Sequence, residues 1–125
     1  PLFLECTLDE TTGEPLTALA HRGARRVFSA QTARALRELL ASVVTEGTGH
    51  EAAPTEGTAA GKTGTAQTGQ FAAGKELKNY WFAGFYPARN PRYTIVVLQD
   101  GQTGPSRTSA AIFARVCDAL DAAGE

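Results

Sequence analysis

Two strand-like segments joined by a short turn constrain the fold of this chain most. Residues 80–86 (YWFAGFY) are rich in aromatic side chains and are followed by a proline, and residues 92–99 (RYTIVVLQ) have a continuous apolar centre. Residues 88–91 predict the turn between them, so the two segments should form an antiparallel hairpin. The unbroken apolar run at 95–98 further predicts a strand that is covered on both faces, as in the middle of a sheet.

Two other segments show the apolar periodicity of amphipathic helices. In residues 30–46 apolar side chains recur at i, i+3, i+4, i+7 and i+8, with Ser29 as a candidate N-cap and Gly47 as the stop. Ser106 or Thr108 should cap a second helix near the end of the chain. The two apolar faces consist of Leu36, Leu39, Leu40, Val43 and Val44, and of Ile112, Phe113, Val116, Cys117 and Leu120.

The rest of the chain predicts an N-terminal hairpin and a third strand before the central hairpin. The order is then hairpin, helix, three strands and helix, which gives an α+β fold: an antiparallel β-sheet with flanking helices. The predicted ranges are strands 2–8 and 16–20 around a turn at 9–15, a connection at 45–58, a strand at 61–68, a polar loop at 70–79 and a turn at 100–105.

The composition fits one globular domain over residues 1–125, large enough for a single core. The 12 basic and 13 acidic residues are mixed along the chain and give a net charge of -1, so we expect no nucleic-acid partner. No apolar run approaches the roughly 20 residues that span a bilayer. Because the chain begins at Pro1 rather than at a methionine, we expect it to be a piece of a longer protein.

Cysteine and histidine residues are too sparse to predict a metal site. Cys6 and Cys117 lie far apart without metal-ligand spacing, so we expect free thiols or, in an oxidising compartment, a disulfide. His21 and His50 fall in predicted connections, where an exposed side chain is the usual role. We expect neither a metal nor a cofactor.

The stretch from Gly61 to Gly69 (GKTGTAQTG) combines one lysine with hydroxyl side chains and glycines. One interpretation is a phosphate-binding loop, but Glu56 occupies the position of its first glycine and would repel a phosphate. The flanking residues also predict no helix whose N-terminus would face the anion. A nucleotide site is therefore not expected.

The other interpretation places this stretch on a strand that recognises a peptide-like substrate with an anionic end. Backbone amides along an exposed strand edge are free to bind such a substrate, and Gly64 permits its close approach. A regular strand would separate the lysine from the Thr65 hydroxyl, because alternation gives one face to Lys62, Gly64 and Ala66 and the other to Thr63, Thr65 and Gln67.

Lys62-Thr63-Gly64 is the Lys-Thr-Gly motif of penicillin-recognising serine enzymes. The similarity extends over nearly the whole chain, since residues 36–49, 60–67, 81–87 and 90–98 resemble, in order, the C-terminal half of a penicillin-binding protein transpeptidase domain. The chain resembles most the monofunctional, high-molecular-mass class. This resemblance implies a partial penicillin-binding fold and a D,D-transpeptidase that cross-links peptidoglycan stem peptides by acyl transfer.

The resemblance implies substrate binding by Lys62, Thr63, Gly64, Thr65 and Gln67. The Lys62 ammonium would hold the terminal carboxylate of a stem peptide ending in D-Ala-D-Ala, or of a β-lactam. The Thr63 and Thr65 hydroxyls would bind or orient that carboxylate, and Gln67 would lie further along the cleft. The Thr65 backbone amide would form half of the oxyanion hole, a donor worth about 10² to 10³ in rate.

Two further motifs of the family are missing, because none of the four serines begins Ser-x-x-Lys or Ser-x-Asn. The resemblance then implies that the nucleophile lies upstream, and that this C-terminal fragment is inactive and is not acylated by penicillin on its own. The alternative is a non-catalytic penicillin-binding-like sensor or scaffold, which the upstream motifs would decide. The serines are Ser29, Ser42, Ser106 and Ser109.

The family also implies a location and an exposed surface. The full-length protein would act at the extracytoplasmic face of a bacterial cell membrane, through an anchor outside this chain. Strands outside this chain would cover the apolar strand at 92–99. Its open edge therefore predicts self-association or a swapped dimer of the fragment.

Overall fold

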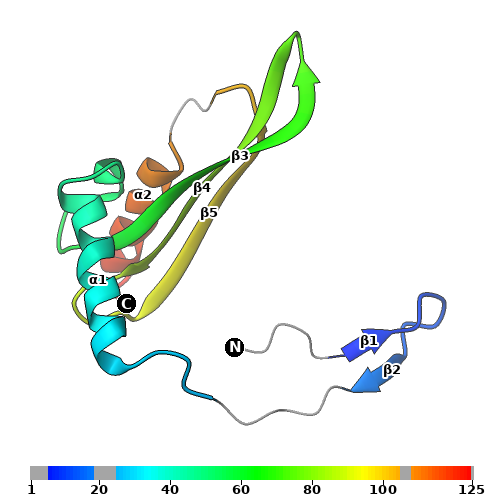
Figure 1. Ribbon diagram of the computed structural model, residues 1–125, viewed down its shortest axis with the longest axis horizontal. Helices are drawn as coiled ribbons and strands as arrows, with labels where there is room; N and C mark the ends of the chain where they lie inside the picture. Colours follow the sequence, from blue (N-terminus) through cyan, green and yellow to red (C-terminus); the bar gives the residue numbers. More distant parts are fainter. Residues whose placement is uncertain (1–5, 19–24, 105–107, 125) are drawn as a thin grey trace.

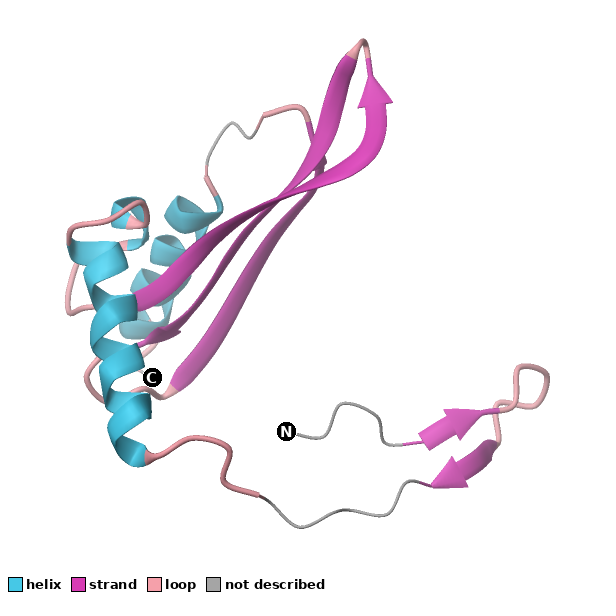
Figure 2. Ribbon diagram, viewed as in Figure 1, coloured by secondary structure: helices cyan, strands magenta, loops and turns pink. Residues whose placement is uncertain are grey.

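The computed structural model describes residues 6–18, 25–104 and 108–124. Strands β3, β4 and β5 form an antiparallel sheet in that order, β1 and β2 form a separate hairpin, and both helices pack on the larger sheet (Figures 1 and 2). The predicted α+β fold is confirmed. The elements are β1 (Cys6–Leu8), β2 (Pro15–Ala18), α1 (Ala30–Thr45), the 3-10 helix η1 (His50–Ala52), β3 (Ala60–Ala72), β4 (Lys75–Tyr86), β5 (Tyr93–Gln102) and α2 (Ser109–Ala122).

The turn of the N-terminal hairpin is held by one carboxylate. Asp9 Oδ1 accepts the backbone N–H groups of Thr11 and Thr12 at 2.8 Å each. These donors, that of Thr12 first, hold the pKa of Asp9 below its usual value. Figure 1 shows the hairpin apart from the three-stranded sheet. The predicted hairpin is confirmed over β1 and β2, while residues 2–5 and 19–20 lie outside the described part of the chain.

The long hairpin of β3 and β4 shows that the prediction of a polar loop at residues 70–79 is wrong. β3 continues to Ala72 and β4 begins at Lys75. The two residues between them, Ala73 and Gly74, have φ values of 49° and 75°, as the tightest hairpin turns require. These strand segments carry polar side chains on both faces, so they lack the alternation of apolar and polar residues by which a strand is predicted from sequence.

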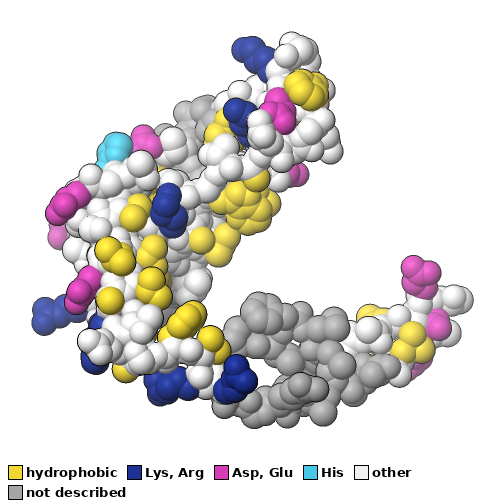
Figure 3. All heavy atoms as spheres, viewed as in Figure 1, with side chains coloured by type: hydrophobic (Ala, Val, Ile, Leu, Met, Phe, Trp, Pro, Cys, Tyr) yellow, Lys and Arg dark blue, Asp and Glu magenta, His cyan; other side chains and the backbone are white. Residues whose placement is uncertain are grey.

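β5 forms an edge of the three-stranded sheet. Its residues alternate between half-buried and exposed, with Val96 57% and Leu98 44% exposed. The prediction of a strand covered on both faces is therefore wrong, since Ile95 and Val97 pack on the core while the side chains between and beyond them face outward. Figure 3 shows apolar side chains gathered over the middle of this sheet. The strand also runs to Gln102, into the predicted turn.

The core lies between the sheet and the helices. Phe82 from β4 and Phe113 from α2 are fully buried, with ring centroids 4.7 Å apart and planes inclined by 56°. Tilted aromatic pairs of this kind combine a large buried area with a favourable ring geometry. The core cluster consists of Val44, Ala52, Ala59, Phe82, Tyr86, Ala110, Phe113 and Cys117.

Both helices begin at predicted caps. The hydroxyl oxygens of Ser29 and Thr108 accept backbone N–H groups in the first turns of α1 and α2, at 3.0 and 3.1 Å. Ser106, the alternative cap, lies outside the described residues. The predicted apolar face of α1 is only partly covered, since Leu36 and Leu39 are 44% and 64% exposed.

Tyr86 ties the end of the sheet to α2 and to the segment before β3. Its hydroxyl donates to Asp121 Oδ2 at 2.6 Å and lies 3.3 Å from the Glu56 carbonyl oxygen. The hydrogen bond to Asp121, followed by burial, raises the pKa of Tyr86 to about 12. On α2, which also carries Asp121, burial and the nearby Asp118 carboxylate raise the pKa of the Cys117 thiol to about 11. Both groups therefore stay neutral at physiological pH.

The two cysteines are free thiols, with Cys6 half-buried in β1 and Cys117 buried in α2. Within residues 6–18, 25–104 and 108–124, no helix has both the length and the apolar character that crossing a membrane requires.

Candidate functional site

The motif-bearing start of β3 lies at the edge of the sheet opposite to β5. Residues that pair across two antiparallel strands share a face. Thr63 therefore faces the core side with Phe82, and Lys62 faces the other side with Ala83. Every second N–H and C=O of an edge strand points away from its neighbour, so β3 offers backbone groups to a ligand. The register pairs Lys62, Thr63, Gly64 and Thr65 with Ala83, Phe82, Trp81 and Tyr80.

Two glycines directly opposite each other fix the height of the motif above the core. Gly61 of β3 pairs with Gly84 of β4. A Cβ on Gly61 would lie 2.6 Å from the Phe82 ring, and a Cβ on Gly84 would lie 2.5 Å from the Ala60 carbonyl oxygen. Only glycine permits this approach. Lys62 follows directly, so its backbone position depends on this close packing.

The Lys62 ammonium and the Thr63 hydroxyl meet at the start of the motif. Lys62 is exposed, and its Nζ donates to Thr63 Oγ1 at 3.0 Å and to the Thr63 carbonyl oxygen at 3.1 Å. The long lysine side chain thus reaches the hydroxyl next to it, although the two side chains leave opposite faces of the strand. Thr63 Oγ1 accepts from the ammonium, so its own proton can be donated either to the Thr48 hydroxyl oxygen, 3.5 Å away, or to a ligand.

A hollow of about 180 Å³ adjoins the motif on the helix-covered side of the sheet. Its lining is rich in hydroxyl groups and contains one carboxylate, from Glu51. The Thr48 and Thr63 hydroxyl oxygens lie 3.5 Å apart at this position. The lining residues are Thr48, Glu51, Thr63, Gly64, Thr65, Tyr80, Trp81, Thr108, Ser109 and Ala110.

Hydrogen bonds between distant segments hold this hollow together. The Thr108 hydroxyl donates to Glu51 Oε2 at 2.6 Å, which joins the cap of α2 to η1. The Ser109 hydroxyl lies 2.9 Å from the Tyr80 carbonyl oxygen and 2.7 Å from Gln99 Oε1. Sequence reasoning missed Glu51 and Ser109 as site residues, because no local motif marks them. The helix-cap pattern was the only signal that pointed to Thr108.

Gln67 lies apart from the other predicted site residues. Its Nε2 donates to Glu76 Oε2 at 3.0 Å, and the Gly69 backbone N–H lies 3.4 Å from the other oxygen of the same carboxylate. The structure therefore places Lys62 to Thr65 together and uses the Gln67 amide in a cross-strand pair further along β3. His50 is exposed in η1, and His21 lies outside the described residues.

The arrangement suits the binding of an anion beside an extended chain. An exposed ammonium, an adjacent hydroxyl and the free backbone groups of an edge strand are the components that hold a carboxylate and the peptide attached to it. The described residues hold no cluster of three or more His, Cys, Asp or Glu side chains that would bind a metal.

Comparison with known proteins identifies the family. A family model described as penicillin binding protein transpeptidase domain matches residues 9–118. The chain is similar to penicillin-binding protein PbpB of Mycolicibacterium smegmatis, with 38% identity over 110 residues that cover 76% of this chain and 17% of that protein.

Two solved structures share the fold. The transpeptidase domain of penicillin-binding protein 3 from Burkholderia pseudomallei matches with 32% identity and a TM-score of 0.65, over 92% of this chain and 35% of that one. The transpeptidase domain of FtsI4 D,D-transpeptidase from Legionella pneumophila matches with 29% identity and a TM-score of 0.60, over 76% and 36%.

The chain spans about a third of these solved domains and 17% of PbpB. The family match nevertheless includes the whole Lys-Thr-Gly strand, the three-stranded sheet and most of both helices. The predicted resemblance is confirmed: the chain belongs to the penicillin-binding protein transpeptidase family.

Proposed function

We propose that this chain is the C-terminal part of a D,D-transpeptidase domain that cross-links peptidoglycan stem peptides and binds β-lactams. Residues 62–67 form one wall of the substrate cleft, and the nucleophilic serine comes from a segment upstream of this chain. The observation that carries the proposal is the exposed Lys62 ammonium, which lies 3.0 Å from the Thr63 hydroxyl at the open edge of β3.

In this proposal Lys62 binds the terminal carboxylate of D-Ala-D-Ala or of a β-lactam. Thr63 donates its hydroxyl proton to the same carboxylate, and Gly64 lets the substrate backbone approach β3. The Thr65 backbone amide supplies half of the oxyanion hole, and its side chain orients the bound anion. Gln67 lines the outer end of the cleft, where its bond to Glu76 has to open for a direct contact with substrate.

The carboxylate should bind at the open edge of β3, where the Lys62 ammonium meets the Thr63 hydroxyl, rather than deep inside the hollow. Glu51 places a carboxylate in that hollow, and a second carboxylate there would be repelled. At the exposed edge the ammonium offers an opposite charge, and its three N–H donors exceed the two hydrogen bonds that it makes to Thr63. Within the hollow, the Thr48 hydroxyl oxygen lies 3.5 Å from Thr63 Oγ1 and helps to position the Thr63 side chain at this edge.

The proposed activity belongs to the full-length protein and has a definite cellular location. The full-length protein acts at the extracytoplasmic face of a bacterial membrane, to which a segment outside this chain anchors it. This chain by itself is inactive and self-associates. A non-catalytic sensor or scaffold domain would use the same strand to bind a β-lactam, and would be recognised by the loss of Ser-x-x-Lys or Ser-x-Asn upstream.

Titration of the ¹⁵N-labelled chain with N-acetyl-D-Ala-D-Ala tests the binding role. We expect amide shifts at residues 61–67 that weaken by about tenfold or more in Lys62→Ala, since a hydrogen bond to a charged group contributes about 1.5–3 kcal/mol. Lys62→Arg keeps the charge and should retain most of the binding. Equal shifts with the C-terminal amide of the same ligand, or no loss in Lys62→Ala, would contradict the proposal.

Acylation gives an independent test. After incubation with a fluorescent penicillin and denaturing electrophoresis, we expect no labelled band from this chain, because acyl transfer requires an activated nucleophile that the proposal places upstream. A longer version that includes an upstream Ser-x-x-Lys segment should label, and should label more slowly with Lys62→Ala. A covalent band from the 125-residue chain would show that it holds its own nucleophile.

A further inference from the structure

We propose that Asp118 of α2 is a positioning residue for the Lys-Thr-Gly strand. Its carboxylate holds the connection between α1 and β3, residues 46–59, from which this strand begins. The role rests on the proposed function, because that function assigns substrate binding to Lys62 to Thr65. The hydrogen bonds that hold the connection join residues of this chain only.

Asp118 binds one residue of the connection with both of its carboxylate oxygens. Oδ1 accepts the Thr55 backbone N–H at 2.7 Å, and Oδ2 accepts the Thr55 hydroxyl at 3.2 Å. Hydrogen bonds to an ionised group are roughly twice as strong as bonds between neutral groups. Two of them to the same residue fix the direction of the Thr55 backbone as well as its position.

The last part of the connection depends on contacts with other elements. Residues 53–59 form no helix or strand. Near β4, Tyr86 Oη lies 3.3 Å from the Glu56 carbonyl oxygen, and the Ala88 N–H donates to the Thr58 carbonyl oxygen at 2.7 Å. A segment without regular structure opens more easily than a sheet unless side chains hold it.

α2 provides a fixed anchor for this bond. Its Phe113 side chain is fully buried and packs against Phe82 of β4. Its first turn is tied to the same connection, because the cap Thr108 donates to Glu51 Oε2 at 2.6 Å. Thr108 and Asp118 lie about 15 Å apart along the helix, so α2 holds the connection at two separate points.

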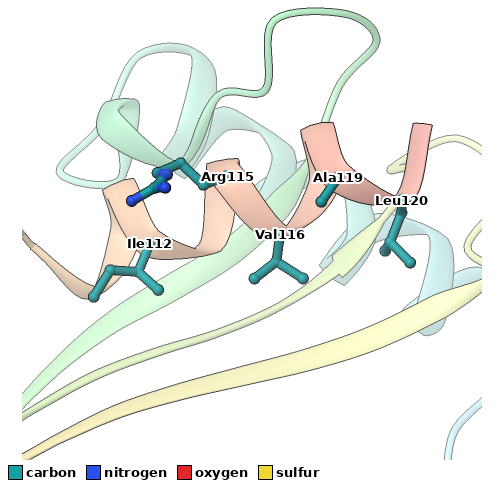
Figure 4. Close-up of a pocket in the computed structure, with 5 residues that line it drawn as sticks. All are labelled: Ile112, Arg115, Val116, Ala119 and Leu120. Carbon is teal, nitrogen blue, oxygen red and sulfur yellow. The ribbon is translucent and has the colours of Figure 1, made fainter. Parts of the chain in front are cut away.

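The position of Asp118 on α2 directs its carboxylate at the connection. Figure 4 shows Ile112, Val116 and Leu120 leaving the helix on one side, where they line an open hollow of about 410 Å³. With 3.6 residues per turn, Asp118 lies on the side opposite to Val116. Its bonds to Thr55 show that this side faces the connection.

A displaced connection would move the motif, because tightly packed residues lie between them. Ala59 and Ala60 are fully buried, and a Cβ on Gly61 would lie 2.6 Å from the Phe82 ring. A close-packed interior transmits strain instead of absorbing it. When the connection opens, the backbone that carries Lys62 therefore shifts. The affinity of a site falls in proportion to the fraction of molecules in the binding-competent state.

Amide hydrogen exchange measures this role of Asp118 in the free chain. Asp118→Ala removes both bonds, so we expect exchange at Thr55 and Ala88 to accelerate by about tenfold or more, as the loss of a hydrogen bond to a charged group predicts. Amides of α2 and β5 should change much less, because the opening is local. Asp118→Asn should resemble the wild type, since its side-chain oxygen can accept the Thr55 N–H while its amide group donates to the hydroxyl.

Titration with N-acetyl-D-Ala-D-Ala measures the consequence for the site. We expect the dissociation constant to rise by about threefold or more in Asp118→Ala and to change by less than about twofold in Asp118→Asn. Asp100→Ala is the matched control, because Asp100 is exposed on β5, at the other edge of the sheet from β3. It removes the same charge and should bind normally. Urea denaturation confirms that each variant is folded under the conditions of the titration.

Unchanged exchange at Thr55 and Ala88 in Asp118→Ala, or unchanged affinity in that variant, would overturn the proposal. Acceleration of all protected amides by the same factor would also overturn it, because Asp118 would then contribute only to global stability. Asp118→Asn must differ from Asp118→Ala, since equal effects would show that charge rather than hydrogen bonding matters. A wild-type chain that does not bind the ligand would instead contradict the proposed function, and the exchange comparison would still decide whether Asp118 holds the connection.

Discussion

Replacing Phe82 with alanine is expected to lower the free energy of unfolding by about 3–5 kcal/mol. Phe82 is fully buried and packs 4.7 Å from Phe113, centroid to centroid. Its removal leaves a cavity between β4 and α2 that the rigid hairpin cannot close, and the lost contacts add to the cost of the cavity. Since single domains are stable by about 5–15 kcal/mol, much of the variant should be unfolded at modest urea concentrations.

Phe71→Ala is the matched control. The same residue type lies on the same hairpin but is 69% exposed, so its replacement should change stability by no more than about 0.5 kcal/mol. Urea denaturation followed by far-ultraviolet circular dichroism, at protein concentrations low enough to keep the chain monomeric, measures both variants. Equal midpoints for Phe82→Ala and Phe71→Ala would show that the aromatic pair is not the centre of the core.

The helices and the central hairpin were predictable because their signals are local. Hydroxyl side chains at the right positions predict Ser29 as one cap and Ser106 or Thr108 as the other, and the apolar faces predict the helix periods; Ser29 and Thr108 are the caps observed. The β3–β4 ribbon was not predictable in this way. Its outer part is polar on both faces, and its turn uses Ala73 in a left-handed conformation that alanine seldom adopts.

The position of β5 in the sheet could not be predicted for a different reason. An apolar run such as Ile95–Leu98 predicts a strand, but the strand's neighbours depend on long-range pairing that a single segment does not encode. Its central position was inferred from the run, whereas the register with β4 leaves it at an edge. Burial of Ile95 and Val97 alone accounts for half of the apolar pattern. The other half, Val96 and Leu98, is exposed.

The candidate site likewise contains one part that is predictable from the sequence and one part that is not. Lys62 to Thr65 are contiguous, so their grouping on one strand follows from the sequence. Thr48, Glu51 and Thr108 come from three segments, which are brought together where η1 contacts both helices and the helices pack on the sheet. No spacing rule connects them, and the structure is needed to find them.

Gly84 and Gly64 are expected to have different roles, the first in packing and the second in substrate binding. Gly84→Ala should therefore lower the free energy of unfolding by about 1–3 kcal/mol or more. A Cβ there would lie 2.5 Å from the Ala60 carbonyl oxygen and 3.0 Å from the Phe113 ring. The nearest atom belongs to the backbone of β3, so relief requires β3 to move away from β4. Lys62 lies two residues beyond Ala60 and would move with it.

Gly64→Ala should weaken ligand binding without lowering stability. A Cβ at Gly64 meets Trp81 Cβ at 3.5 Å, an ordinary contact, and alanine loses less backbone entropy than glycine on folding. The variant should therefore be as stable as the parent, while the added methyl group at the substrate-facing strand weakens binding of N-acetyl-D-Ala-D-Ala. Urea denaturation and NMR titration of both variants separate the effects. If Gly64→Ala binds normally, the substrate does not approach β3 at this residue. If Gly84→Ala is as stable as Gly64→Ala, the Gly61–Gly84 contact does not set the height of the motif.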